Sequence, residues 1–193
     1  MHFIPGTIAI GSSTGGPEAL LALFTKLKGR LDHVPVFITQ HTPAKATRFL
    51  AQQISKVSGY HCAEAVDGEP VVNGRIYLAP GDYHMVVENR GNDLTIAINQ
   101  DPEENFCRPA IDPMVRSIAS IYGSSTLFII MTGMGKDGLD AAKAVKAMEG
   151  RVVAQNEETS VVWGMPGTVV KAGLCNKILS LTEIGDYLCQ ILP

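Results

Sequence analysis

Four short apolar runs rich in Val and Ile constrain the fold of this chain more than any other feature. Continuous runs of this length are typical of parallel β-strands whose two faces are both covered by other elements. Between the runs, apolar residues recur with the 3.6-residue period of amphipathic helices. Because strands and helices alternate, the sequence predicts an α/β fold with a doubly wound, mostly parallel sheet flanked by helices. The runs are TIAIG (7–11), VPVFITQ (34–40), TLFIIM (126–131) and RVVAQ (151–155).

Start and stop signals delimit the helical segments. Pro17 suits a first helical turn, and glycines stand where helices should end, at Gly29, Gly59, Gly123 and Gly150. One region departs from the alternation. Residues 74–98 contain short alternating segments around the turn signals PGD and NRGND, which predict an antiparallel hairpin or meander at one edge of the sheet. Helices are expected over 17–29, 45–59, 112–123, 137–150 and 182–192.

Chain length and composition favour a single domain over residues 1–193. The chain has 46% hydrophobic residues, enough to bury one substantial core. Its net charge of −3 comes from interspersed charges, which argues against a nucleic-acid surface or a polybasic membrane patch. No apolar stretch reaches the roughly 18 to 20 residues that a membrane span requires. The four cysteines are too widely spaced for C-x-x-C chemistry and no signal-peptide pattern is present, so we expect reduced thiols in a cytoplasmic protein.

Reactive side chains follow three of the predicted strands. Ser12, Ser13 and Thr14 come after the first strand, His41 follows VFITQ, and Asp137 follows LFIIM within TGMGKDG. In an open parallel sheet, loops at the carboxyl ends of the strands line the ligand crevice. A hydroxyl, an imidazole and a carboxylate together are the parts of a nucleophile, a base and an orienting acid. The sequence therefore favours a hydrolytic site at this edge of the sheet.

Each of these residues also has a structural interpretation. A hydroxyl from residues 12–14 and the Asp137 carboxylate are both common helix N-caps, and His41 alone is more often structural. The glycine-rich turn GSSTGG also fits an anion at a helix N-terminus, although it matches neither G-x-G-x-x-G nor G-x-x-x-x-G-K-[ST]. The alternatives are thus a nucleotide- or phosphate-binding α/β module without hydrolase activity, and an interaction domain on a hydrolase scaffold.

Six further segments of the chain are IAIGSSTGGPEAL, ITQHTP, IYLAPGDYHM, RPAID, MTGMGKDG and VVAQNEETSVVWGMP. Together, in order and over nearly the whole chain, they resemble the catalytic domain of the chemotaxis receptor methylesterase family (CheB). The resemblance implies a doubly wound α/β serine hydrolase that removes methyl groups from γ-glutamyl methyl esters of chemoreceptors and releases methanol. Many members also deamidate receptor glutamines. The implied partner is the cytoplasmic helices of methyl-accepting receptors, with no nucleic acid, membrane insertion, cofactor or metal.

The same resemblance assigns roles to individual residues. It implies Ser13, directly before Thr-Gly-Gly, as the nucleophile, His41 as the base and Asp137 as the orienting acid. Met134 is similar to the residue whose backbone N–H helps to form the oxyanion hole. Thr14 follows the nucleophile, and its N–H is the expected second donor by analogy with nucleophile elbows.

Two features depart from the family pattern. Family members commonly have an N-terminal receiver domain, whereas this chain begins six residues before its first predicted strand. We therefore expect either a separated catalytic domain or a protein regulated otherwise, with a separate receiver protein as a further partner. Cys107 stands before RPAID, where the family often has histidine. Arg108 is expected either to bind an acidic receptor surface or to open a helix.

Overall fold

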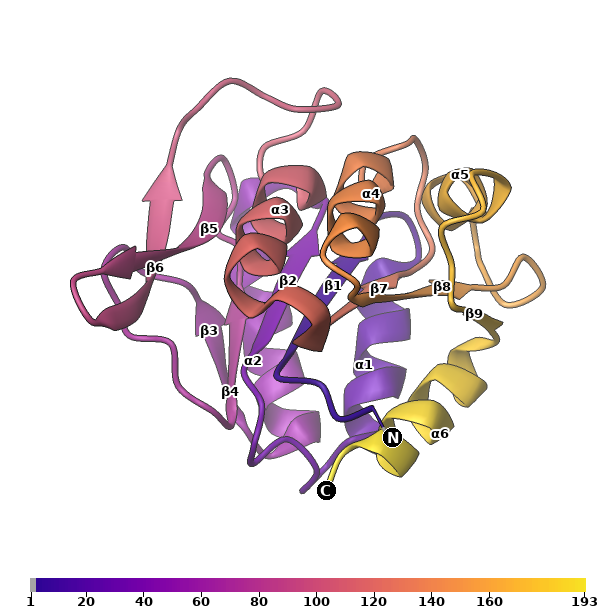
Figure 1. The fold of residues 1–193 in the computed structure, drawn as a ribbon, viewed down its shortest axis with the longest axis horizontal. Helices are drawn as coiled ribbons and strands as arrows, with labels where there is room; N and C mark the ends of the chain where they lie inside the picture. The colour runs from indigo at the N-terminus through magenta and orange to yellow at the C-terminus, as the bar shows by residue number, and fades with distance from the viewer. Residues whose placement is uncertain (1–2) are drawn as a thin grey trace.

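A parallel sheet of seven strands forms the middle layer of the structure, a computed structural model that describes residues 3–193 (Figure 1). The strand order is β3-β4-β2-β1-β7-β8-β9, which places β1 in the centre. All neighbouring strands pair in parallel, as expected when crossovers on the sheet faces connect them. The strands are β1 (Thr7–Ser12), β2 (Val36–Gln40), β3 (His61–Glu64), β4 (Arg75–Leu78), β7 (Thr126–Ile130), β8 (Arg151–Gln155) and β9 (Lys177–Leu179).

Helices cover both faces of this sheet (Figure 1). One layer contains α1 (Gly16–Lys26), α2 (Thr47–Ser58) and α6 (Leu181–Ile191), and the other contains α3 (Ile111–Tyr122), α4 (Leu139–Ala147) and α5 (Met165–Lys171). Two short 3₁₀ turns, η1 (Ala44–Ala46) and η2 (Gly123–Ser125), precede α2 and β7. In the described part of the chain, no helix combines the length and the apolar character that crossing a bilayer would require.

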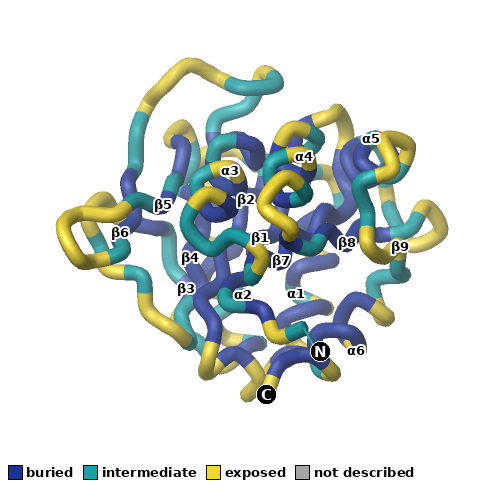
Figure 2. Tube along the Cα trace, in the orientation of Figure 1, coloured by how far each residue is buried: buried dark blue, intermediate teal, exposed yellow. Residues whose placement is uncertain are grey.

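The sheet separates two apolar cores. Along β1, Ile8 and Ile10 belong to the core under α1, α2 and α6, whereas Ala9 belongs to the core shared with α3, α4 and α5. This alternation follows from the two-residue period of a strand. Every residue of β1, β2 and β7 is buried, and the central strands are dark blue in Figure 2. Burial on both faces explains why these strands are continuous apolar runs in the sequence.

The predicted strands and helices lie within three residues of the observed ones at each end. The sequence pattern does not indicate the edge strands β3 and β9, because they have only four and three residues and are partly exposed. It also misses α5, a seven-residue helix whose first residues are Met-Pro-Gly. Proline and glycine at these positions are more typical of a loop.

The predicted antiparallel hairpin is present, but it is shorter than expected. β5 (His84–Arg90) pairs antiparallel with β6 (Asp93–Asn99) in a separate two-stranded sheet, which lies on the β3–β4 side of the molecule and packs against α3 (Figure 1). The segment Arg75–Leu78 differs from the prediction. It forms β4 and pairs in parallel with β2 and β3. Three of its four residues are buried, which suits the interior of the main sheet.

The C-terminal helix begins at a capping box that offers a test of local stability. Ser180 Oγ accepts the Glu183 N–H at 3.3 Å, and the Glu183 carboxylate accepts the Ser180 N–H at 2.8 Å. We predict that Ser180→Ala lowers the free energy of unfolding by about 1 kcal/mol, because the Glu183 N–H loses its acceptor. Urea denaturation measures this change. Ser120→Ala, at an exposed position of α3, is the control; an equal loss there would contradict the assignment.

Candidate active site

The carboxyl ends of β1, β2 and β7 lie at the same edge of the sheet, and the predicted catalytic residues follow them. Ser13 follows β1, His41 follows β2, and Asp137 lies in the loop between β7 and α4. The strands that follow β1 in the chain lie first on its β2 side, and the later strands, from β7 on, lie on its other side. In doubly wound sheets, the ligand crevice opens where the strand order reverses in this way.

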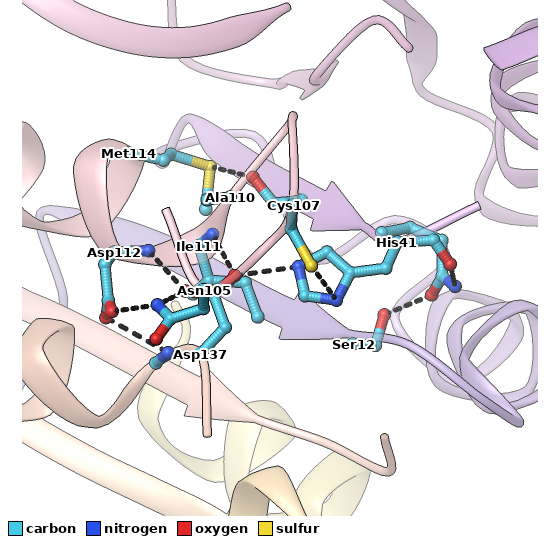
Figure 3. Close-up of polar contacts among 12 residues, drawn as sticks. Ser12, His41, Asn105, Cys107, Ala110, Ile111, Asp112, Met114 and Asp137 are labelled. Atoms are coloured by element: carbon cyan, nitrogen blue, oxygen red, sulfur yellow. Dashed lines mark hydrogen bonds and ion pairs between the residues drawn. The ribbon is translucent and has the colours of Figure 1, made fainter. Parts of the chain in front are cut away.

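His41 and Asp137 form the central contact of the site (Figure 3). His41 Nε2 lies 2.7 Å from Asp137 Oδ2. The Asp137 side chain is 2% exposed and the His41 side chain 13%, so little water competes with the contact. A carboxylate at Nε2 fixes a proton on that nitrogen and leaves Nδ1 as the atom that can accept another.

Asp137 does not cap its own helix. The N-cap of α4 is Gly138, with no capping side chain. The Asp137 carboxylate instead accepts the N–H of Ile111 at 2.7 Å and that of Asp112 at 3.0 Å, at the start of α3. The Asn105 amide also donates to its Oδ1 at 3.2 Å. A negative charge is favourable at a helix N-terminus, so α3 holds the carboxylate in its position beside the imidazole.

Asp112 makes the reciprocal contact to α4. Its Oδ1 accepts the N–H groups of Gly138 and Ala141, and its Oδ2 accepts the Asn105 amide (Figure 3). Asn105 therefore bridges the carboxylates of Asp112 and Asp137. Burial, together with the charge of Asp137, raises the pKa of Asp112 to about 6, although its hydrogen bonds act in the opposite direction.

Ser13 lies in the β1–α1 turn and does not cap α1. The N-cap of α1 is Gly15, in the left-handed conformation with φ 79° and without a capping side chain. The Ser13 N–H donates to the Thr132 carbonyl at 2.9 Å, and a Cβ on Gly133 would lie 2.6 Å from Ser13 Cβ. Within residues 3–193 the Ser13 hydroxyl makes no hydrogen bond, and none joins it to His41. In ligand-free sites such catalytic contacts are often long, and the hydroxyl stays available to a substrate.

Ser12 has a different role from Ser13. Its buried hydroxyl donates to Gln40 Oε1 at 2.6 Å (Figure 3). Gln40 Nε2 in turn donates to the carbonyls of Ser13 and His41, both at 2.9 Å. A Cβ on Gly16 would lie 1.9 Å from Gln40 Oε1, so this glycine makes room for the carboxamide. Gln40 thus links the backbones of Ser13 and His41. A polar residue at the end of a buried strand is a sequence signal that could have indicated this role.

The predicted oxyanion donors have free N–H groups. Among the described residues, neither the Thr14 N–H nor the Met134 N–H donates a hydrogen bond. Thr14 adjoins Ser13 in the chain, and Met134 adjoins Gly133, which contacts Ser13. Uncommitted backbone donors next to a nucleophile are what an oxyanion hole requires.

His84 and Arg108 hold the long loop between β6 and α3. His84 is 1% exposed, donates from Nε2 to the Pro102 carbonyl at 3.1 Å and accepts the Ala110 N–H at Nδ1. Arg108 Nε donates to the Asp82 carbonyl at 2.8 Å, and its Nη1 donates to two more carbonyls in the loop. Its guanidinium therefore binds backbone oxygens, and Arg108 does not open a helix, because α3 begins at Ile111 with Ala110 as its N-cap.

The electrostatics of the site favour a protonated imidazole. Burial lowers the pKa of His41, but hydrogen bonds to Asp137 and Cys107 and the charge of Asp137 outweigh it and raise the pKa to about 9. The resting site therefore contains an imidazolium beside a carboxylate at neutral pH. His41 must release this proton before it can act as a base.

This pKa can be measured by NMR titration of the His41 ring. We predict a midpoint near pH 9 in the wild type. Asp137→Asn removes the main interaction that favours the charged ring while burial remains, so the midpoint should fall to about 6.5 or lower. Asp140→Asn changes an exposed carboxylate that pairs with Lys143 and should leave the midpoint unchanged. A midpoint that is the same in Asp137→Asn and the wild type would contradict this account.

The Ser12 hydroxyl is expected to contribute to stability. Ser12→Ala leaves Gln40 Oε1 buried without its donor, so we predict a loss of about 1–3 kcal/mol in the free energy of unfolding. Thr14→Ala, two residues away and exposed, should change it by less than about 0.5 kcal/mol. Thermal and urea denaturation of both variants give the comparison, and equal effects would exclude the proposed role of Ser12.

Several known proteins are similar to this chain. A family model described as CheB methylesterase matches residues 8–188. The protein-glutamate methylesterase/protein-glutamine glutaminase 1 of Paramagnetospirillum magneticum is 51% identical over 187 residues, which cover 97% of this chain and 49% of that protein. The protein-glutamate methylesterase/protein-glutamine glutaminase of Azospirillum brasilense is 51% identical over 185 residues, 95% of this chain and 47% of that protein. This chain thus spans about half the length of the curated relatives it matches.

A solved structure is similar over the whole domain. The crystal structure of the Thermotoga maritima CheB methylesterase catalytic domain superposes with a TM-score of 0.93 at 36% identity, covering 97% of this chain and 99% of that one. Sequence and fold lead to the same assignment: the chain belongs to the CheB methylesterase family.

Proposed function

We propose that residues 1–193 form a single catalytic domain of a serine hydrolase that acts on γ-glutamyl methyl esters of chemoreceptors and releases methanol. The observation that supports this most directly is the buried His41–Asp137 pair, 2.7 Å apart, at the strand ends that also hold Ser13. The relatives' names add support for ester hydrolysis and for deamidation of glutamine. The same features disfavour the nucleotide- or phosphate-binding alternative, because Gly16 accommodates the Gln40 side chain.

The proposed reaction begins at His41. After it loses its extra proton, His41 accepts the Ser13 hydroxyl proton at Nδ1, because Nε2 remains hydrogen-bonded to Asp137. Ser13 Oγ then attacks the ester carbonyl carbon. Collapse of the tetrahedral intermediate expels methanol, which takes its proton from His41, and leaves an acyl-serine. Water activated by the same histidine hydrolyses the acyl-serine and yields glutamate. Ammonia replaces methanol when the substrate is glutamine.

The negative charge that develops on the carbonyl oxygen requires hydrogen-bond donors that point at this oxygen. The free N–H groups of Met134 and Thr14 are the proposed oxyanion donors. A donor of this kind contributes about 10²- to 10³-fold in rate in comparable sites. Thr14 follows Ser13 in the β1–α1 turn, and Met134 follows Gly133, which contacts Ser13. The positions of both donors therefore depend on the turn that positions the nucleophile. The proposed reaction uses no cofactor and no metal.

The partners and location follow from this substrate. The proposed protein substrate is the cytoplasmic helices of a methyl-accepting receptor, and the proposed location is the cytoplasm. The matched relatives are about twice as long as this chain, and control of the site by a receiver protein is part of the proposal.

Active-site labelling tests the proposal directly. A fluorophosphonate reacts with an activated serine, so mass-spectrometric mapping should find the adduct on Ser13. Ser13→Ala should abolish labelling and lower methanol release from methylated receptors by on the order of 10³-fold or more, with the fold intact.

Ser12→Ala is the matched variant for this experiment. Its adduct should still map to Ser13, because the Ser12 hydroxyl faces Gln40. An adduct on Ser12, or methanol release that survives Ser13→Ala, would overturn the assignment of the nucleophile.

A further inference from the structure

The thiol of Cys107 lies against the catalytic histidine. Cys107 Sγ is 3.7 Å from His41 Nδ1, the nitrogen that Asp137 leaves free (Figure 3). The ligand atoms of His41, Cys107 and Asp137 all lie within 4.8 Å of one another. In the part of the chain that the structure describes, this is the only such group of three metal-binding side chains.

The geometry of the pair fits a zinc ion. With Zn–N near 2.0–2.1 Å and Zn–S near 2.3 Å, two tetrahedral ligands lie about 3.6 Å apart. The observed 3.7 Å between His41 Nδ1 and Cys107 Sγ therefore needs almost no rearrangement. Histidines that bind zinc through one nitrogen usually donate the other N–H to a carboxylate, and His41 already makes this contact to Asp137.

The surroundings leave room for an ion. An open cavity of about 230 Å³ is lined by His41, Cys107 and Glu103, among others, so water can reach the two ligands and complete a coordination shell. Glu103 adds a carboxylate to the wall of the cavity. Arg108 also lines it, and its guanidinium is held by the backbone carbonyls of Asp82 and Asp101.

We propose that His41 Nδ1 and Cys107 Sγ form a Zn²⁺ site that reversibly inhibits the enzyme. On binding, the Cys107 thiol and Nδ1 of the His41 imidazolium each release a proton to solvent, and the thiolate and the neutral imidazole then coordinate the ion, with no change of oxidation state. That lone pair must otherwise accept the Ser13 proton, so a bound ion blocks the first step. The binding follows from the side-chain geometry alone, whereas the inhibition rests on the proposed function.

Metal binding is tested without reference to activity. The reduced protein is titrated with Zn²⁺ in competition with a chromophoric chelator, and separately with Co²⁺, whose thiolate complexes give a sulfur-to-metal absorption band. The wild type should bind one Zn²⁺ and show this band with Co²⁺. Cys107→Ser and Cys107→Ala should lose the band and bind Zn²⁺ about tenfold or more weakly. Cys189→Ser, which changes another half-buried free thiol, should behave as the wild type.

Inhibition is tested by the rate of fluorophosphonate labelling. Zn²⁺ should slow labelling of the wild type and of Cys189→Ser, a chelator should restore it, and both Cys107 variants should be far less sensitive relative to their own metal-free rates. Absence of stoichiometric Zn²⁺ binding, or equal binding by wild type and Cys107→Ser, overturns the site. Binding through Cys107 with unchanged labelling overturns the inhibition. A metal-free protein that is never labelled at Ser13 overturns the proposed function, while the titration still decides the site.

Discussion

Asp137 accepts hydrogen bonds from three separate parts of the chain, and the arrangement of the site depends on this convergence. Its carboxylate binds the ring of His41, two N–H groups at the start of α3 and the amide of Asn105. Asp112 in α3 returns the contact by accepting N–H groups at the start of α4. Two helices are thus joined through their N-termini, where each carboxylate is favoured by the oriented backbone dipoles. The histidine is held because its carboxylate partner is bound at the start of α3.

Gln40 provides the corresponding constraint on the other side of the site. One carboxamide accepts from Ser12 and donates to the carbonyls of Ser13 and His41. The proposed nucleophile and the proposed base are therefore positioned through their backbones, and the Ser13 hydroxyl remains unbonded among residues 3–193. Rigid backbones with a free reactive group are the arrangement that preorganised catalysis requires. The pair Ser12–Gln40 explains why two serines stand together although only Ser13 is proposed to react.

The loop between β6 and α3 contributes the features that distinguish this site. It has little regular structure; His84 binds its backbone at Pro102 and Ala110, and Arg108 within the loop donates to the carbonyl of Asp82 outside it. It places Asn105 on one side of the His41–Asp137 pair and Cys107 on the other. Positions of this kind vary more readily than the strands they connect. Sequence patterns gave no role to Asn105, because nothing in the local spacing indicates which distant carboxylates its amide will reach.

The sequence by itself determined the layered α/β architecture, the central strands and the edge of the sheet where reactive residues gather. Those features follow from local periodicity and from the rule that parallel strands present their carboxyl ends together. Only the tertiary structure decided that Arg75–Leu78 joins the main sheet, that Gln40 and Asp112 fix the site, and that the Cys107 thiol faces His41. These contacts join residues far apart in the chain, and their geometry depends on how α3, α4 and the loops pack, which no local pattern of residues specifies.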